Sequence, residues 1–188
     1  MKLCRFALSL ACTVLLSACQ STTIVSTENY NPQTQARIRL YGQNQKPSLL
    51  EYVHNNEKVK QNVGGLLSDA FSSFVGGTKN ISLGMPKTDW MNDMHDHDGI
   101  LSKVFYREFY IPAGIPIHVH NAYIGLGGSY SDGKSVISHY EKSCRSRTVT
   151  FTAQPGRDYE VVPIVPINSS EFCAVEVRDI TSGKSETL

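Results

Sequence analysis

Alternating apolar and polar positions recur along the second half of the chain and predict short β-strands there. The stretches with this pattern are 104–111, 115–119 with an extension over 122–126, 148–153, 159–165 and 172–177. Turn-forming residues separate several of them, at 112–114, 132–133 and 155–156. Many short strands with regular turn signals are typical of a mainly β fold. We therefore predict a small antiparallel β-sandwich or barrel-like domain.

The first half of the chain predicts two more strands and one helix. Residues 36–43 alternate Ile38 and Leu40 with arginine and tyrosine, which predicts a half-buried strand, and 48–53 predicts a second strand. Between 63 and 76, apolar residues recur at helical spacing before a Gly-Gly pair, which predicts one short helix. Its polar face has no Lys or Arg, so packing onto the domain is favoured over lying in a membrane interface.

The N-terminus has the pattern of an export signal. Lys2 and Arg5 precede an apolar run over 6–17, which is too short to span a bilayer but has the length of a signal-peptide core. The run ends in Leu-Ser-Ala-Cys at 16–19, with small residues before Cys19. An ordinary signal peptide that happens to contain Cys19 is the alternative interpretation.

The tetrapeptide 16–19 resembles the lipobox of bacterial lipoproteins at all four positions. The resemblance implies cleavage before Cys19, lipidation of that cysteine and stable anchoring to a membrane through several acyl chains. In this family, Gln20 in place of Asp implies transfer to the outer membrane. Residues 1–18 are then a signal peptide, and 19–35 are the lipidated cysteine and a flexible tether with a span of roughly 20–25 Å. Residues 36–188 form one β-rich domain, expected to face the periplasm.

Composition and charge limit the partners. The 188 residues suit a single domain, and 18 basic side chains nearly balance 17 acidic ones. Nucleic-acid-binding proteins usually carry a clear basic excess, so we expect no nucleic-acid partner. The membrane, reached through the lipid anchor, and an envelope protein of unknown identity are the expected partners.

The cysteine count predicts one disulfide. Cys4 and Cys12 lie in the signal peptide and Cys19 is the lipid acceptor, which leaves Cys144 and Cys173 in an oxidising compartment. Two free buried thiols are the alternative. Cys144 could also be a thiol activated by nearby arginines, but the disulfide is favoured.

A phosphate-binding motif occurs at 128–135, where the residues satisfy G-x-x-x-x-G-K-[ST]. The context disagrees with this motif, because no convincing helix follows and Asp132 would place a negative charge beside the phosphates. Asp132-Gly133 is better interpreted as a hairpin turn, so we expect no nucleotide.

Two histidine clusters could hold a metal ion. His95, Asp96, His97 and Asp98 follow two methionines, and these residue types suit zinc or copper. His118 and His120 share one strand face. The alternative is a solvated loop at 95–98 and two solvent-facing histidines opposite an apolar face. We expect no resident cofactor, with zinc or copper as the alternative.

Known catalytic motifs are absent: the sequence contains no G-x-S-x-G, H-E-x-x-H or C-x-x-C. We therefore expect no enzyme and assign no catalytic residue. The aromatic side chains within 105–110 are expected in the core and in cross-strand pairs rather than in a binding patch.

Four stretches resemble a group of small, poorly characterised bacterial envelope lipoproteins: 36–44, 81–88, 101–119 and 144–162. This resemblance implies a β fold and an envelope location, and it transfers no catalytic residue. The sequence thus predicts a lipid-anchored outer-membrane protein that acts as a non-catalytic binding or structural accessory module. A metal-binding envelope protein and an inhibitor or immunity-type protein are the alternatives.

Overall fold

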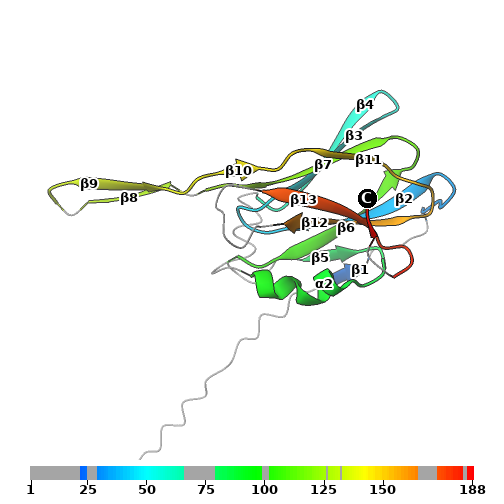
Figure 1. Cartoon of the computed structure of the whole chain (residues 1–188), viewed down its shortest axis with the longest axis horizontal. Helices are drawn as coiled ribbons and strands as arrows, with labels where there is room; N and C mark the ends of the chain where they lie inside the picture. The colour runs from blue at the N-terminus through cyan, green and yellow to red at the C-terminus, as the bar shows by residue number, and fades with distance from the viewer. Residues whose placement is uncertain are drawn as a thin grey trace, which may run out of the picture.

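Two β-sheets pack face to face and form the body of the protein, and a third, two-stranded sheet projects from it (Figure 1). The computed structural model describes residues 22–24, 29–65, 79–98, 102–125, 127–131, 133–164, 173–183 and 186–188. The mainly β, sandwich-like fold predicted from the sequence is confirmed.

The larger sheet has seven strands in the order β1-β5-β6-β2-β12-β13-β14. Their bounds, in that order, are Thr22–Ile24, Asn80–Ser82, Phe105–Pro112, Gln35–Gly42, Asp158–Ile164, Ala174–Asp179 and Glu186–Thr187. Three neighbouring pairs are antiparallel, namely β6 with β2, β12 with β13 and β13 with β14. The other three, β1 with β5, β5 with β6 and β2 with β12, are parallel.

The smaller sheet has the order β10-β7-β3-β4, and β11 also pairs with β7. Their bounds are Cys144–Arg145 for β10, Pro116–Tyr123 for β7, Ser48–His54 for β3, Glu57–Val63 for β4 and Val149–Thr152 for β11. The projecting hairpin consists of β8 (Gly127–Ser131) and β9 (Val136–Tyr140). A short helix α2 (Asp89–Asp93) continues into a 3-10 turn η1 (Met94–His97) beside the larger sheet.

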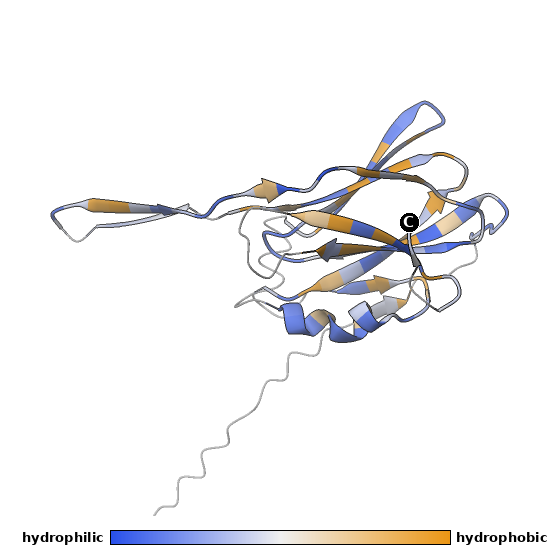
Figure 2. Cartoon of the chain, in the orientation of Figure 1, coloured by the Kyte–Doolittle hydropathy of each residue, from blue (hydrophilic) through white to orange (hydrophobic). Residues whose placement is uncertain are grey.

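The main core lies between the two sheets. Apolar residues alternate with polar ones along the strands, as Figure 2 shows, and the apolar set of each sheet faces the other. The buried core residues include Ile38 and Leu40 of β2, Val161 of β12, Leu50 of β3 and Val119 of β7. Where β2 ends, the two sheets approach so closely that a Cβ atom added to Gly42 would lie only 2.3 Å from a backbone oxygen of β4.

The outer face of β2 is also buried, contrary to the half-buried strand that its alternation predicts. Arg39 and Tyr41 point away from the main core, yet almost no surface of either is exposed. The segment that follows β5 covers them and contributes the buried side chains of Leu83, Met85 and Met94. A second apolar cluster forms there, with Tyr41 and Met94 among its members. The polar residues of β2 are thus interior groups rather than surface groups.

Several other predictions differ from the structure. Strand β4 is not among the strands that the sequence predicts. Residues 22–24 of the predicted flexible tether form strand β1 at the edge of the larger sheet. The helix predicted over about 63–76 lies outside the described residues from position 66 onward, and Val63 is the last residue of β4. The observed helix α2 falls in a stretch that showed no periodicity. The predicted signal peptide, residues 1–18, and Cys19 also lie outside the described residues.

The segment that matches the phosphate-binding pattern is a hairpin. β8 and β9 pair in antiparallel register, with Gly127 opposite Tyr140 and Ser131 opposite Val136, and Gly133 has the positive φ of +84° that a tight turn requires. A strand thus occupies 136–140, where the phosphate-binding motif requires a helix. None of the helices within the described ranges has both the length and the apolar character needed to cross a membrane.

Candidate functional site

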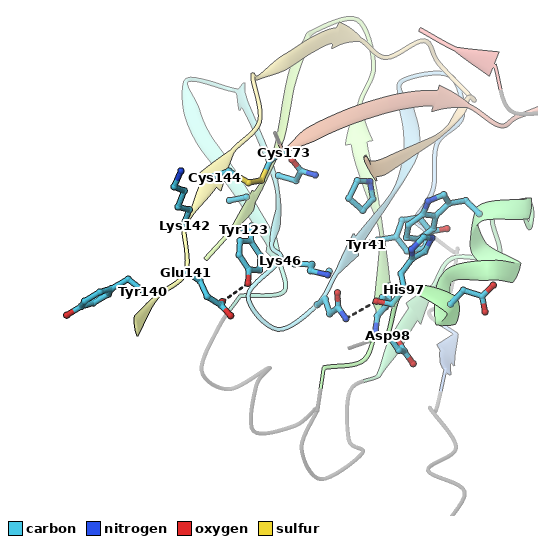
Figure 3. A pocket seen from close by; sticks show the side chains of 18 of the residues that line it. Tyr41, Lys46, His97, Asp98, Tyr123, Tyr140, Glu141, Lys142, Cys144 and Cys173 are labelled. Atoms are coloured by element: carbon cyan, nitrogen blue, oxygen red, sulfur yellow. Dashed lines mark hydrogen bonds between the residues drawn. A yellow bond between two sulfur atoms is a disulfide. The ribbon is translucent and has the colours of Figure 1, made fainter. Parts of the chain in front are cut away.

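A pocket of about 930 Å³ opens beside the base of the β8–β9 hairpin (Figure 3). Two walls enclose it. One wall comes from the end of β2 and the α2–η1 segment, and it includes Tyr41, Gln43, Trp90, His97 and Asp98. The other comes from the end of β7, the base of the hairpin and the disulfide, and it includes Tyr123, Tyr140, Glu141, Lys142 and Cys144.

A row of three rings in contact, Tyr41, Trp90 and His97, forms part of the first wall. The rings of Tyr41 and Trp90 lie 4.1 Å apart, and Trp90 stacks on His97 at 5.3 Å with an angle of 14° between the planes. The helix that carries Trp90 begins at Thr88, whose side chain caps it by accepting a hydrogen bond from the Met91 backbone N–H. Each ring therefore contacts another, and Trp90 lies between the strand and the 3-10 turn.

A buried charge network lies behind the first wall. The guanidinium of Arg39 donates two hydrogen bonds to Glu108 Oε1, at 2.9 and 2.7 Å, and one to Glu160 Oε1 at 3.2 Å. The hydroxyls of Tyr41 and Thr88 also donate to Glu160 Oε1, at 2.6 and 2.7 Å. None of the three charged side chains is exposed to solvent. The network connects β6, β2 and β12 to the segment that precedes α2.

Electrostatics keep Arg39 charged and Tyr41 neutral in this network. Burial alone would lower the pKa of Arg39, but Tyr41 and the two carboxylates raise it above its usual value. Burial and the neighbouring Glu160 raise the pKa of Tyr41, so its hydroxyl stays protonated and keeps donating to Glu160. Tyr41 is thus a fixed part of the pocket wall rather than a proton donor for chemistry.

The second wall joins the hairpin to the body. Tyr123 at the end of β7 donates a hydrogen bond to Glu141 Oε2 at 2.6 Å, and this bond raises the pKa of the tyrosine. The backbone N–H of Gly125 donates to Ser143 Oγ at 3.0 Å. Cys144 and Cys173, the pair predicted from the cysteine count, form a disulfide with their Cα atoms 5.8 Å apart. The base of the hairpin is therefore fastened at several points.

We call the β8–β9 hairpin, residues 127–140, the arm. It extends away from the body at the left of Figure 1, and every described residue of its two strands is exposed. Four large apolar side chains lie on it: Tyr130 and Ile137 are cross-strand partners on one face, and Val136 and Tyr140 lie on the other. They are between 44% and 77% exposed.

The predicted metal ligands do not come together as one site. His95 Nδ1 lies 3.2 Å from Asp98 Oδ2, and Asp98 Oδ1 accepts a hydrogen bond from the Val104 backbone N–H. His97 stacks on Trp90, and Asp96 and His97 line the pocket. In the ranges that the structure describes, no group of three or more His, Cys, Asp or Glu residues is arranged to hold a metal ion.

His118 and His120, the second pair of candidate metal ligands, lie in different environments. His118 is exposed and shares a hydrogen bond of 2.9 Å with Thr150 Oγ1. His120 was expected at the surface, but it is only 5% exposed. The guanidinium of Arg145 lies 3.5 Å from its ring nitrogen. Burial and this arginine lower the pKa of His120, which favours its neutral form.

Sequence reasoning missed most of the pocket-lining residues. Tyr41, Trp90, Tyr123 and Glu141 come from four separate segments, and no local spacing marks them as neighbours. The available signal was limited to Trp90, which is the only tryptophan in the chain. No family model, no curated protein and no solved structure gives a significant match to this chain.

Proposed function

We propose that this protein is a lipoprotein of the outer membrane, lipidated at Cys19, whose β domain faces the periplasm and binds an envelope protein without catalysing a reaction. The observation that carries this proposal is the arm. Its two strands pair only with each other within the described part of the chain, and they expose four large apolar side chains.

Physical reasoning supports a docking role for such a hairpin. A two-stranded ribbon that packs against no third element is marginally stable in water. Exposed apolar side chains gathered on one projection cost hydration free energy, which contact with another protein would recover. Both outer edges of the ribbon carry backbone groups that can pair with a strand of a partner. The arm thus has the features of a binding element and none of those of a core element.

The pocket extends this surface toward the body. Tyr140 belongs both to the end of the arm and to the pocket wall, and Glu141 next to it also lines the pocket. A partner segment that lies along the arm can therefore continue into the pocket. The pocket combines aromatic rings with charged side chains of both signs, including Lys46, Asp96 and Lys142. This mixture suits a peptide segment with apolar and polar residues.

The carboxylates and rings of the pocket have structural bonds, which supports a non-catalytic role. Asp98 accepts from a backbone N–H, Glu141 accepts from Tyr123, and Tyr41 donates to Glu160. Catalytic groups usually form a nucleophile–base pair that faces a cavity. These bonds instead hold the walls in place.

Site-specific photocrosslinking in intact envelopes tests the proposal. A photoreactive amino acid replaces Tyr130 or Val136 in the lipidated protein, and mass spectrometry identifies the crosslinked product. A matched control carries the same group at Asn56, at the tip of the β3–β4 hairpin, which is exposed but lies on a different projection. We expect one dominant product from the arm positions and none of it from Asn56.

Two further variants decide whether the contact is specific. The double substitution Tyr130→Ser with Ile137→Ser should remove the product captured from Val136 while the thermal stability stays within about 0.5 kcal/mol of wild type, because both residues are exposed. Cys19→Ala should release the protein from the membrane fraction. Equal crosslinking from the arm and from Asn56, or a product that survives the double substitution, would overturn the docking role. Inhibition of a captured enzyme would identify the inhibitor class.

A further inference from the structure

Strand β1 lies very close in sequence to the lipid-acceptor cysteine. β1 begins at Thr22 and pairs with β5 in parallel register, with Thr22 opposite Asn80 and Ile24 opposite Ser82. Only Gln20 and Ser21 separate Cys19 from this strand. Because consecutive Cα atoms are about 3.8 Å apart, the Cα atoms of Cys19 and Thr22 cannot be more than about 11 Å apart.

A second contact fixes the chain that follows β1. The ring of Tyr30 stacks on that of Tyr110 in β6, with 5.2 Å between the ring centres, and the guanidinium carbon of Arg37 lies 5.5 Å from the centre of the Tyr30 ring. The chain is thus attached to the larger sheet at Thr22–Ile24 and again at Tyr30. The distance from the lipidated residue to the domain is therefore far shorter than the roughly 20–25 Å of a free tether.

We propose that the β1 edge of the larger sheet is the membrane-facing edge of the protein and contacts the lipid headgroups. This inference rests on the lipidation of Cys19, which is part of the proposed function. The headgroup region of one leaflet is roughly 5–8 Å thick, which is comparable to the reach between Cys19 and Thr22. The short connection therefore holds β1 at the bilayer surface.

The edge itself suits this position. Ile24 is 79% exposed and places a large apolar side chain where it can enter the interface. The segment that covers the larger sheet is net acidic at its surface, because exposed Lys87 is outnumbered by exposed Asp89, Asp93 and Asp96. The orientation thus follows from the short connection and from Ile24, not from attraction to anionic lipid.

The sheet then stands on its edge above the bilayer. β14 is at the opposite end of the strand order from β1, and six strand spacings of about 4.8 Å place it roughly 29 Å away across the sheet. Leu188, just after β14, is 60% exposed and provides a matched apolar position at this far edge. In Figure 1, β1, β5 and α2 lie together along the lower margin of the body.

Depth-dependent fluorescence quenching tests the inference. The lipidated full-length mature protein is reconstituted into vesicles of phosphatidylethanolamine and phosphatidylglycerol that contain a lipid with a nitroxide headgroup. A fluorescent amino acid replaces Ile24 in one sample and Leu188 in the other. We expect several-fold stronger quenching at Ile24 than at Leu188. An inserted Gly-Ser segment of about fifteen residues between Ser21 and Thr22, with a span of about 20 Å, should abolish that difference.

Each outcome has a separate meaning. Mass spectrometry first establishes whether Cys19 is acylated, and an unmodified cysteine would refute the proposed anchoring itself. With acylation established, equal quenching at the two positions would overturn the membrane-facing edge and leave the anchor intact. Quenching at Ile24 that persists after the insertion would show that the short connection does not set the orientation, which also overturns the inference.

Discussion

Replacing Arg39 tests whether the buried charge network stabilises the fold. The substitution Arg39→Met keeps much of the side-chain volume and removes the positive charge between Glu108 and Glu160, neither of which is exposed to solvent. Both carboxylates then remain buried and lose the guanidinium that binds them. Glu160 keeps the hydrogen bonds from Tyr41 and Thr88 to Oε1, but its Oε2 atom is buried without a hydrogen-bond partner in the described structure.

The size of the effect follows from the burial. Breaking a fully buried ion pair by removing one partner costs about 3–5 kcal/mol, because an uncompensated charge stays in the interior. For a domain of this size, such a loss lowers the melting temperature by roughly 6–20 °C.

Urea unfolding of the unlipidated Cys19→Ala protein measures this loss. Trp90 is the only tryptophan and contacts Tyr41, so its fluorescence reports directly on the segment that covers the network. Arg37→Met is the matched control: Arg37 is on the same face of β2 and binds Asp158 through two bonds of 2.7 Å, but its side chain is 19% exposed. Arg37→Met should lower the free energy of unfolding clearly less than Arg39→Met does, because solvent screens a partly exposed ion pair.

Two results would refute the reasoning. A loss below about 1 kcal/mol for Arg39→Met would mean that the carboxylates find other compensation, contrary to their burial. An equal loss for both variants would mean that burial of the charge does not determine its contribution to the free energy of unfolding.

Three further predictions concern stability. Replacing Cys144 with Ala opens the disulfide loop and should lower the free energy of unfolding by roughly 3.5 kcal/mol in urea titrations, and an unchanged midpoint would contradict this. Gly42→Ala should destabilise by about 1–3 kcal/mol because its Cβ would meet a backbone oxygen at 2.3 Å, whereas Gly128→Ala, with open space around it, should be neutral by calorimetry. The lowered pKa of His120 means that the folded state takes up a proton less readily than the unfolded chain, so stability falls as the pH drops below about 6.5. His120→Gln should show a shallower fall than wild type, and identical slopes for the two proteins would contradict the prediction.

The strands of the second half could be predicted because one face of each is apolar and turn residues separate them. Strands β6, β7, β11, β12 and β13 all match predicted stretches to within a few residues. Strand β4 was missed because it has few apolar residues. Its available signal was the Asn55-Asn56 turn, where both residues have positive φ.

The burial of both faces of β2 could not be predicted from the strand itself. Its arginines and tyrosine have the pattern of a solvent-facing row, and their environment depends on a segment more than forty residues later in the chain. The pocket also depends on distant segments, since Trp90 and Tyr123 line opposite walls of it and are more than thirty residues apart in the sequence. Local periodicity reports which residues are apolar, but it does not report which polar residues another segment will cover.

The disulfide changes how mechanical force would pass from the arm into the body. β10, which follows the arm, pairs with β7 through only two residue pairs, so tension on that strand alone could separate the pairs one after another. The bond from Cys144 to Cys173 gives a second, covalent path into β13, which pairs with β12 over six residue pairs. A partner that pulls on the arm would therefore load both sheets at once. Rupture would then require many hydrogen bonds to break together, so an intact disulfide makes the arm suitable for a contact that has to resist mechanical strain.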